Sequence, residues 1–448
     1  MANPPQDPHD AAFFEQMRQC REPYRRLADC FDAVVGKQES CLDIGCGIGL
    51  QTARLQELGW NAAGAEYSPY AIEMIEPGVT VTPLDLTQLH DGQTEGAWDC
   101  VICTETGEHI PAEHAMTVVR NVADRAQKFI IWSAAAPGQE WEGHINLQHP
   151  EYWLTRFRIL GWDIDDDRTA KLRYLMSKTN AQHVLGKENF CVLTKARKPL
   201  HMTIVSTILN GKKWVRKHIE SVVTQTFDNY THYIIDAASD DGTADEAKQV
   251  RSGCWDVYRE KLEIVRNDTR QSALENCWSI WKDLPDDEVI IWLDGDDWLA
   301  HDQALEIVAR AYCASSEPWL TYGQFMFQDG GVGFASPYNP GAHARLDPVW
   351  RATHLKTFRA GLVKKLNVDD IKRPDGSWVD LAIDRTIMWP LLEMAGDRYT
   401  CIPQILSVYN YDASWAANRP ADQLKTELDE VARLRGLTPY PALTKRPW

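Results

Sequence analysis

Three closely spaced aspartates in the second half of the chain carry the strongest chemical signal. Asp294, Asp296 and Asp297 directly follow the apolar run 289–293, so we expect them at the end of a buried strand. Carboxylates this close repel one another unless a cation lies between them, and Mg²⁺ and Mn²⁺ prefer such hard oxygen ligands. We interpret the cluster as a divalent-cation site rather than as a solvated turn.

A second constellation, near the N-terminus, combines glycines with strand-end carboxylates. Gly45, Gly47 and Gly49 lie between the strand-like run 41–44 and the helical pattern 50–58. Glycine lets the backbone approach a ligand closely, and the N-terminus of the next helix offers unpaired N–H groups. Glu66 and Asp85 end the next two predicted strands, where carboxylates can bind ribose hydroxyls and an adenine amine. The glycines alone would also fit a dinucleotide-binding fold.

Acids and imidazoles come together in the loop after the fourth predicted strand. Glu105, Glu108 and His109 follow the run 98–103, and His144 comes from a later loop. Such groups can converge on a divalent cation. The alternative is that they only shape a pocket. His109 or His144 is then the candidate general base, because imidazole titrates near neutral pH.

Residues 30–195 resemble the class I S-adenosylmethionine-dependent methyltransferases in the glycine-rich turn and the two strand-end acids together. The resemblance implies a Rossmann-like domain that binds S-adenosylmethionine through Asp43, Gly45, Gly47, Gly49, Glu66 and Asp85. The loop residues are similar to the metal site of the small-RNA 3′-terminal 2′-O-methyltransferases. This similarity implies a divalent cation on Glu105, Glu108, His109 and His144. The alternative is a degenerate Rossmann domain that binds nothing.

Residues 202–411 resemble the family 2 glycosyltransferases with the GT-A fold, through four motifs in the right order at 205–211, 234–243, 292–298 and 380–384. The resemblance implies a nucleotide-sugar donor held by Thr207, Asp236, Asp268, Asp294 and Asp296. It also implies Mn²⁺ or Mg²⁺ on Asp296 and Asp297, and a base for inverting transfer at Asp384, with Asp380 as the alternative.

Two details of this resemblance keep alternatives open. Many relatives carry a second acid at the position of Ala237, so UDP-sugars and other nucleotide sugars are both candidates. An aspartate at a helix start, such as Asp384, can also be only an N-cap. His354 lies where some relatives supply a further metal or diphosphate contact.

The apolar runs that position these residues alternate with helical patterns, which predicts the α/β fold class with two doubly wound domains. We expect strands at 41–44, 62–65, 80–84, 98–103, 129–133 and 190–194 in a domain over 1–198. A second domain over 199–448 has strands at 202–207, 233–236 and 289–293. The segment 195–201 is the expected linker.

Composition excludes several classes of protein. The 448 residues carry 47 Lys and Arg against 64 Asp and Glu, divided almost evenly between the halves, so neither half is a basic nucleic-acid-binding module. No apolar run approaches the roughly 20 residues of a membrane helix, and the N-terminus does not resemble a signal peptide. We expect a cytoplasmic protein whose 11 cysteines are reduced. Cys100 and Cys103 are expected in the core rather than on zinc.

These observations predict an enzyme that transfers a sugar from a nucleotide sugar and O-methylates a sugar hydroxyl, with a glycan or lipid-linked saccharide as acceptor. Two alternatives remain. The acceptor can be a modified base in nucleic acid, which the acidity of both halves disfavours. One half can also be a degenerate domain that serves as a binding scaffold.

Overall fold

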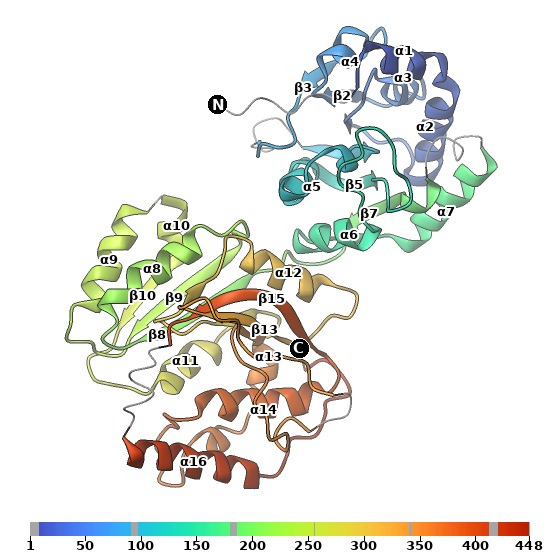
Figure 1. The fold of residues 1–448 in the computed structure, drawn as a ribbon. Coiled ribbons are helices and arrows are strands. Elements are labelled where there is room, and N and C mark those ends of the chain that lie inside the picture. The colour runs from blue at the N-terminus through green and yellow to red at the C-terminus, as the bar shows by residue number, and fades with distance from the viewer. Residues whose placement is uncertain are drawn as a thin grey trace. The chain divides into compact units, whose positions relative to one another are not determined.

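The computed structural model describes residues 9–90, 97–179, 186–254, 256–339, 343–411 and 420–447, and the chain divides between Pro199 and Leu200 into two compact units. Each unit is built on its own sheet (Figure 1). Within the described residues no helix is long and apolar enough to cross a membrane.

The first unit contains a seven-stranded sheet in the order β3-β2-β1-β4-β5-β7-β6. Neighbouring strands are parallel except where β7 meets β5 and β6. The strands are β1 (Cys41–Ile44), β2 (Ala62–Glu66), β3 (Val81–Pro83), β4 (Trp98–Thr104), β5 (Ala126–Ser133), β6 (Trp162–Ile164) and β7 (Cys191–Lys195). Because β1 to β5 are parallel, the residues that follow them gather at one edge.

Helices cover both faces of this sheet. They are α1 (Ala11–Gln19), α2 (Arg21–Val35), α3 (Leu50–Glu57), α4 (Pro69–Glu73), α5 (Ala115–Ala123), α6 (Pro150–Ile159) and α7 (Asp166–Lys178). One core packs α2, α3 and α7 against the sheet, and the other packs α5 and α6 against its opposite face. Cys100 belongs to the first core and Cys103 to the second, so these two thiols lie on opposite faces of β4 and do not form one metal site.

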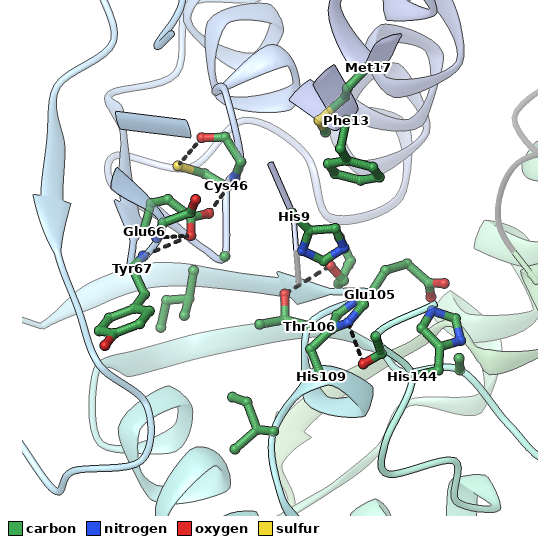
Figure 2. A pocket seen from close by; sticks show the side chains of 18 of the residues that line it. His9, Phe13, Met17, Cys46, Glu66, Tyr67, Glu105, Thr106, His109 and His144 are labelled. Carbon is green, nitrogen blue, oxygen red and sulfur yellow. Dashed lines mark hydrogen bonds between the residues drawn. The ribbon is translucent and has the colours of Figure 1, made fainter. Parts of the chain in front are cut away.

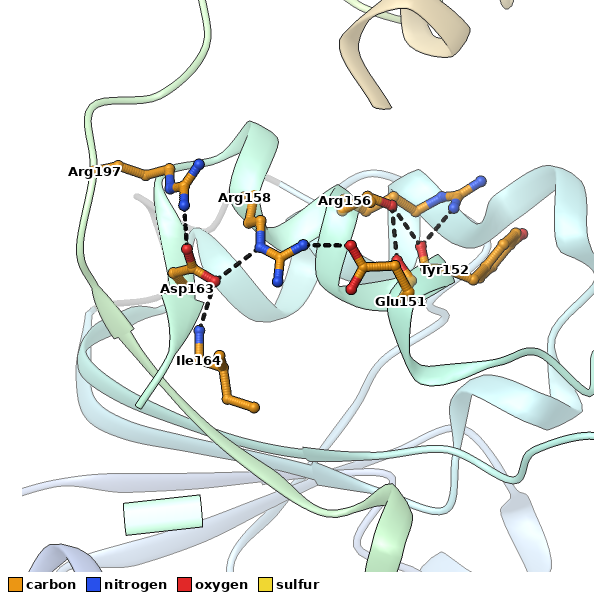
Figure 3. A network of polar contacts seen from close by, with 8 residues as sticks. Glu151, Tyr152, Arg156, Arg158, Asp163, Ile164 and Arg197 are labelled. Carbon is orange, nitrogen blue, oxygen red and sulfur yellow. Dashed lines mark hydrogen bonds and ion pairs between the residues drawn. The ribbon is translucent and has the colours of Figure 1, made fainter. Parts of the chain in front are cut away.

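A polar network ties the end of the first unit to its sheet (Figure 3). Arg158 Nε donates to Asp163 Oδ1 over 2.8 Å, and its guanidinium also bonds Glu151 Oε1 over 2.6 Å. Arg197, in the segment after β7, pairs with the same Asp163. Against the opposing effect of burial, these cations lower the pKa of Asp163. The network therefore anchors Arg197, in the segment that follows β7, to β6 and α6.

The second unit contains an eight-stranded mixed sheet in the order β10-β9-β8-β11-β14-β13-β15-β12. The first four strands of this order are parallel, whereas β14 and β12 run antiparallel to their neighbours. The doubly wound pattern thus covers only part of this sheet. The strands are β8 (Met202–Ile208), β9 (Tyr230–Asp236), β10 (Leu262–Arg266), β11 (Val289–Trp292), β12 (Trp298–Leu299), β13 (Leu320–Phe327), β14 (Lys356–Arg359) and β15 (Tyr399–Tyr409).

The main core of the second unit packs α11 and α14 against β11, β13 and β14. Figure 1 places α8, α9 and α10 together on the parallel part of the sheet. The helices are α8 (Lys212–Val223), α9 (Thr243–Gly253), α10 (Asp256–Lys261), α11 (Ala273–Trp281), α12 (Ala304–Cys313), α13 (Ala360–Val363), α14 (Ile383–Ala395) and α16 (Ala421–Gly436).

Candidate active sites

A cavity of about 800 Å³ opens at the carboxyl edge of the first sheet (Figure 2). Turns after β1, β2 and β4 and the loop after β5 supply most of its wall, as the parallel strands require. Of the residues expected to function here, the wall contains Gly45, Gly47, Glu66, Asp85, Glu105, His109 and His144.

The glycine-rich turn has the backbone shape that its sequence demands. Gly45, Gly47 and Gly49 all have positive φ, of 71°, 55° and 78°. A Cβ on Gly45 would lie 2.2 Å from Thr106 Oγ1, so a side chain there collides with the loop after β4. Gly49 caps α3, which begins at Leu50. The turn brings Gly45 and Gly47 to the cavity wall, and its glycine N–H groups donate to Ala65 O, Glu66 Oε2 and Cys46 O.

The two strand-end acids are fixed by short backbone contacts. Glu66 Oε2 accepts a hydrogen bond from Gly47 N over 2.7 Å, and Oε1 accepts from Tyr67 N over 2.7 Å. Asp85 Oδ1 accepts from Thr87 N over 2.9 Å and from its hydroxyl over 2.7 Å. Both carboxylates are thus oriented before any ligand binds.

Asp43 and Gly49 do not line the cavity, contrary to the expectation that both contact the cofactor. Asp43 is 2% exposed beneath the turn, where Oδ2 accepts from Thr52 Oγ1 over 2.8 Å. Burial raises the pKa of Asp43 to about 7. A Cβ on Gly49 would face Ile75 and Val79, so this glycine serves the packing of the turn.

Glu108, His109 and His144 form a compact group at another part of the wall. One ligand atom from each lies within 4.8 Å of the others. His109 Nδ1 donates to Gly143 O over 3.0 Å, and His144 Nδ1 donates to Gln139 O over 2.7 Å. These bonds leave the lone pair of each ring on Nε2, which is one of the two nitrogens through which a histidine can bind a metal.

The two glutamates of this loop have different surroundings. Glu108 is fully buried, and neither of its oxygens has a side-chain donor among the described residues. Burial and the nearby Glu105 raise the pKa of Glu108 to about 8. Glu105, at a positive φ of 51°, accepts from Ser133 Oγ over 2.7 Å. Glu105 was expected to complete the metal ligands, but it lies outside the compact group.

The N-terminal helix supplies an apolar part of the wall that the sequence motifs did not indicate. Phe13 and Met17 enter the cavity from α1, and Trp141 comes from the loop that carries His144. The rings of Phe13 and Trp141 are 5.4 Å apart, and those of Trp141 and His144 are 5.8 Å apart. The only sequence signal for Phe13 and Met17 was the apolar content of the N-terminal helix, and this content is equally consistent with ordinary core packing.

The acidic turn of the second unit lies between β11 and β12, against the end of β8. Gly295 N donates to Thr207 O over 3.1 Å, and a Cβ on Gly295 would lie 2.6 Å from that oxygen. Glycine therefore allows the acids to approach the predicted donor-binding strand. Thr207 contacts the turn through its carbonyl oxygen.

Asp294, Asp297 and His354 form the second compact group of possible metal ligands. Asp297 is 1% exposed, and its Oδ2 lies 3.6 Å from His354 Nδ1 without a hydrogen-bond partner among the described residues. Burial and the neighbouring aspartates raise the pKa of Asp297. Burial and Lys356 lower the pKa of His354 to about 4, so this imidazole is neutral at pH 7. Asp296, the expected shared ligand, lies outside the group and is exposed.

Lys356 joins this group to the expected base, and nothing in the sequence pattern singled it out. Its side chain is fully buried, with Nζ 2.7 Å from Asp384 Oδ1 and 3.3 Å from Asp294 Oδ2. The ammonium also lies 4.3 Å from the centre of the Trp292 ring. Although burial opposes ionisation, Lys356 lowers the pKa of Asp384. Asp384 is in the first turn of α14, after Ala382 at a positive φ of 55°.

Asp236 lies beside the end of β8, and Asn267 N, next to Asp268, donates to Asp236 O, so these two donor residues share one edge of the sheet. Asp236 is buried at the end of β9, where Oδ1 accepts from Ser239 N over 3.0 Å. Asp268 is exposed after β10. Asp380 pairs with Arg373 at the surface, which separates its contacts from those of Asp384.

The sequence matches two family models. Residues 13–165 match the model described as Methyltransferase domain, and residues 203–340 match Glycosyl transferase family 2. No curated protein matches the chain.

Several solved structures are similar to parts of this chain. TarS of S. aureus is 14% identical, with a TM-score of 0.38 over 52% of this chain and 43% of its own length. A mannosyltransferase, PcManGT from Pyrobaculum calidifontis, is 15% identical, with a TM-score of 0.36 over 52% of this chain and 64% of its own. This chain thus spans less than two thirds of either protein.

A third solved structure is that of a methyltransferase. The sugar N-methyltransferase KedS8 from Streptoalloteichus is 15% identical, with a TM-score of 0.34 over 44% of this chain and 97% of its own length. The first match covers β1 to β6 and the second covers β8 to β13, so His354, Lys356 and Asp384 lie beyond the second match. The chain therefore joins a methyltransferase domain to a family 2 glycosyltransferase domain.

Proposed function

We propose that this chain is a bifunctional enzyme of glycan synthesis. The C-terminal domain transfers a sugar with inversion from a nucleotide sugar, a UDP-sugar or another, to a glycan or lipid-linked saccharide. The N-terminal domain methylates a sugar hydroxyl with S-adenosylmethionine. Both activities are proposed to take place in the cytoplasm.

The observation that carries the sugar-transfer proposal is the ion pair between Lys356 and Asp384 beside the acidic turn. Inverting transfer needs a carboxylate that removes the proton of the acceptor hydroxyl as this oxygen attacks the anomeric carbon. The lowered pKa keeps Asp384 ionised, and Lys356 connects it to Asp294 on the proposed donor side. This arrangement favours Asp384 over Asp380, which is paired with Arg373 at the surface.

The residues of the acidic turn fit a divalent cation. Two carboxylates and a neutral imidazole form a mixed oxygen and nitrogen donor set, and Asp297 Oδ2 is buried without a hydrogen-bond partner. Asp294, Asp297 and His354 would hold the ion, with Asp296 open to the donor. A bound Mn²⁺ or Mg²⁺ supplies positive charge for the departing diphosphate.

Cofactor binding by the first domain is supported by the shape of its cavity. The glycine turn, Glu66 and Asp85 line one part of the wall, as expected for S-adenosylmethionine, and His109 and His144 line another. A sugar hydroxyl placed beside these histidines would face a general base.

The group of Glu108, His109 and His144 also fits a cation. Glu108 is a buried acid without a side-chain donor, and each histidine is fixed with Nε2 as its acceptor nitrogen. The three residues would hold the ion. When bound, a cation lowers the pKa of a sugar hydroxyl that coordinates it.

Two measurements test the proposal. The first is hydrolysis of a panel of nucleotide sugars by the full chain with Mn²⁺, with and without chelator. We expect cation-dependent turnover of one donor. The second is calorimetric titration with S-adenosylmethionine, for which we expect binding that Glu66→Gln weakens and Glu188→Gln, an exposed control, leaves unchanged. If one of the domains does not bind or turn over its own ligand, that domain would instead be a binding scaffold.

A further inference from the structure

An aromatic surface of the second domain is continuous with its acidic site. The aromatic platform consists of Phe325, Phe327, Phe334, Tyr409 and Tyr411. These residues come from the end of β13, the segment that returns beside it, and the end of β15.

Ring contacts connect the platform to the proposed cation ligands. His354 stacks on Tyr409 with ring centres 4.7 Å apart, and Phe325 meets His354 edge to face at 5.3 Å. The platform is therefore adjacent to the reacting groups.

The outer part of the platform is open to solvent. Phe334 is 55% exposed and Tyr411 is 42% exposed. Their rings rest on Phe325 and Phe327, at centre distances of 5.4 Å and 5.9 Å. An exposed set of aromatic side chains of this kind on a soluble domain marks a binding surface more often than it fills space.

A close backbone contact supports the platform. Gly333 N donates to Phe325 O over 2.8 Å, and a Cβ on Gly333 would lie 2.4 Å from the Phe325 ring. The returning segment can therefore lie directly against that ring only because residue 333 has no side chain. This contact fixes the ring that supports Phe334.

We infer that the aromatic platform binds a neutral sugar ring of the acceptor and directs one of its hydroxyls toward Asp384. This inference rests on the proposed sugar transfer. Aromatic faces pack well on the C–H faces of sugars. The adjacent carboxylate of Asp384 can accept a hydrogen bond from a sugar hydroxyl, and the five aromatic side chains of the platform offer no cation to a phosphate or an acidic sugar, so the platform favours neutral sugars over nucleic acid and polyanionic glycans.

The test is binding of the labelled full chain to an array of immobilised neutral oligosaccharides, acidic polysaccharides and single-stranded DNA. We expect wild-type protein to bind at least one neutral oligosaccharide. Phe334→Ala and Tyr411→Ala should each weaken that binding about tenfold or more. Leu428→Ala, which removes an equally exposed apolar side chain on α16, is the control and should have no effect.

A further pair of variants separates stacking from general hydrophobicity. Phe334→Tyr should bind like the wild type because it keeps a flat ring, whereas Phe334→Leu should bind as weakly as Phe334→Ala. Binding that survives both alanine substitutions overturns the inference. It is equally overturned if the wild type binds only the acidic polymers, or nothing on the array.

Donor hydrolysis by the same proteins separates this inference from the proposed function. If the wild type and both alanine variants hydrolyse a nucleotide sugar equally well while sugar binding is unaffected, only the platform assignment fails. If the wild type hydrolyses no nucleotide sugar, the proposed sugar transfer fails.

Discussion

Lys356 Nζ lies 2.7 Å from Asp384 Oδ1, although the two residues come from different elements, β14 and α14. The lysine is fully buried and its second anionic partner is Asp294. A buried ammonium with two carboxylates is electrostatically satisfied only while both remain ionised. The proposed base and the acidic turn are thus coupled through one side chain.

Replacing Lys356 should impair both sugar transfer and stability. Lys356→Met leaves two acids without their cation, and the partial exposure of Asp384 moderates the loss, so we expect a decrease of about 1–3 kcal/mol in the free energy of unfolding. The control is Lys425→Met, which breaks an exposed pair with Asp429 and should leave the free energy of unfolding nearly unchanged. Urea unfolding of both variants at pH 7 measures the difference. Equal losses would contradict the coupling.

Asp384→Asn should lower the rate of sugar transfer about 10²- to 10⁴-fold, because the amide cannot accept the proton of the acceptor. Asp380→Asn is the matched control, since that acid is paired with Arg373, and it should retain most of the activity. Methyl transfer should be unchanged in both variants. The rate of sugar transfer is measured for each variant, with the nucleotide sugar that the hydrolysis panel identifies as the donor. A larger defect in the Asp380 variant would reassign the base.

Removal of a ligand from the first domain's histidine group should weaken cation binding. His144→Ala is expected to reduce Mn²⁺ affinity at least about tenfold, because it deletes one of three clustered ligands. His114→Ala, outside the group, should not change it. Calorimetric titration with Mn²⁺ in the absence of substrate gives both affinities. Methyl transfer that persists at full rate in chelator would show that the group works without metal.

Asp43 should make the first domain less stable as the pH rises. Its folded pKa of about 7 lies above the value near 3.9 in an unfolded chain, so the folded state holds the proton more tightly. The free energy of unfolding therefore falls between about pH 4 and pH 7 by up to a few kcal/mol from this group. Asp43→Asn can still accept from Thr52 and should remove this dependence. Urea unfolding of both proteins between pH 5 and pH 8 checks it, and parallel curves would contradict it.

Local patterns predicted the elements that carry the motifs. The strand at 41–44, the glycine turn and the following helix fall where the spacing of apolar residues and glycines placed them, because each depends on neighbours in the chain. The strand β6 was not predicted, since three residues contain too little periodicity to recognise.

Tertiary relationships were beyond the sequence pattern. Lys356 is buried only because acids from the acidic turn and from α14 meet at it, so its role cannot be read from its neighbours along β14. In the same way, the conformation of the turn buries Asp297 and exposes Asp296, although the two are adjacent. The spacing of the aspartates in the sequence indicates that an acidic cluster exists. Which carboxylate faces which partner is decided only by the fold.

The hydrogen bonds at the junction between the units show where the gene can be divided. Arg197 N donates to Gly161 O in the first unit, and Leu200 O accepts from Asn229 Nδ2 in the second. Only Lys198 and Pro199 lie between these anchors. A split between Pro199 and Leu200, where the chain divides into its two compact units, leaves both anchors with their own halves. We expect each half to fold when it is produced separately. Comparing the activities of the mixed halves with those of the intact chain would then show whether the two domains need to be covalently connected.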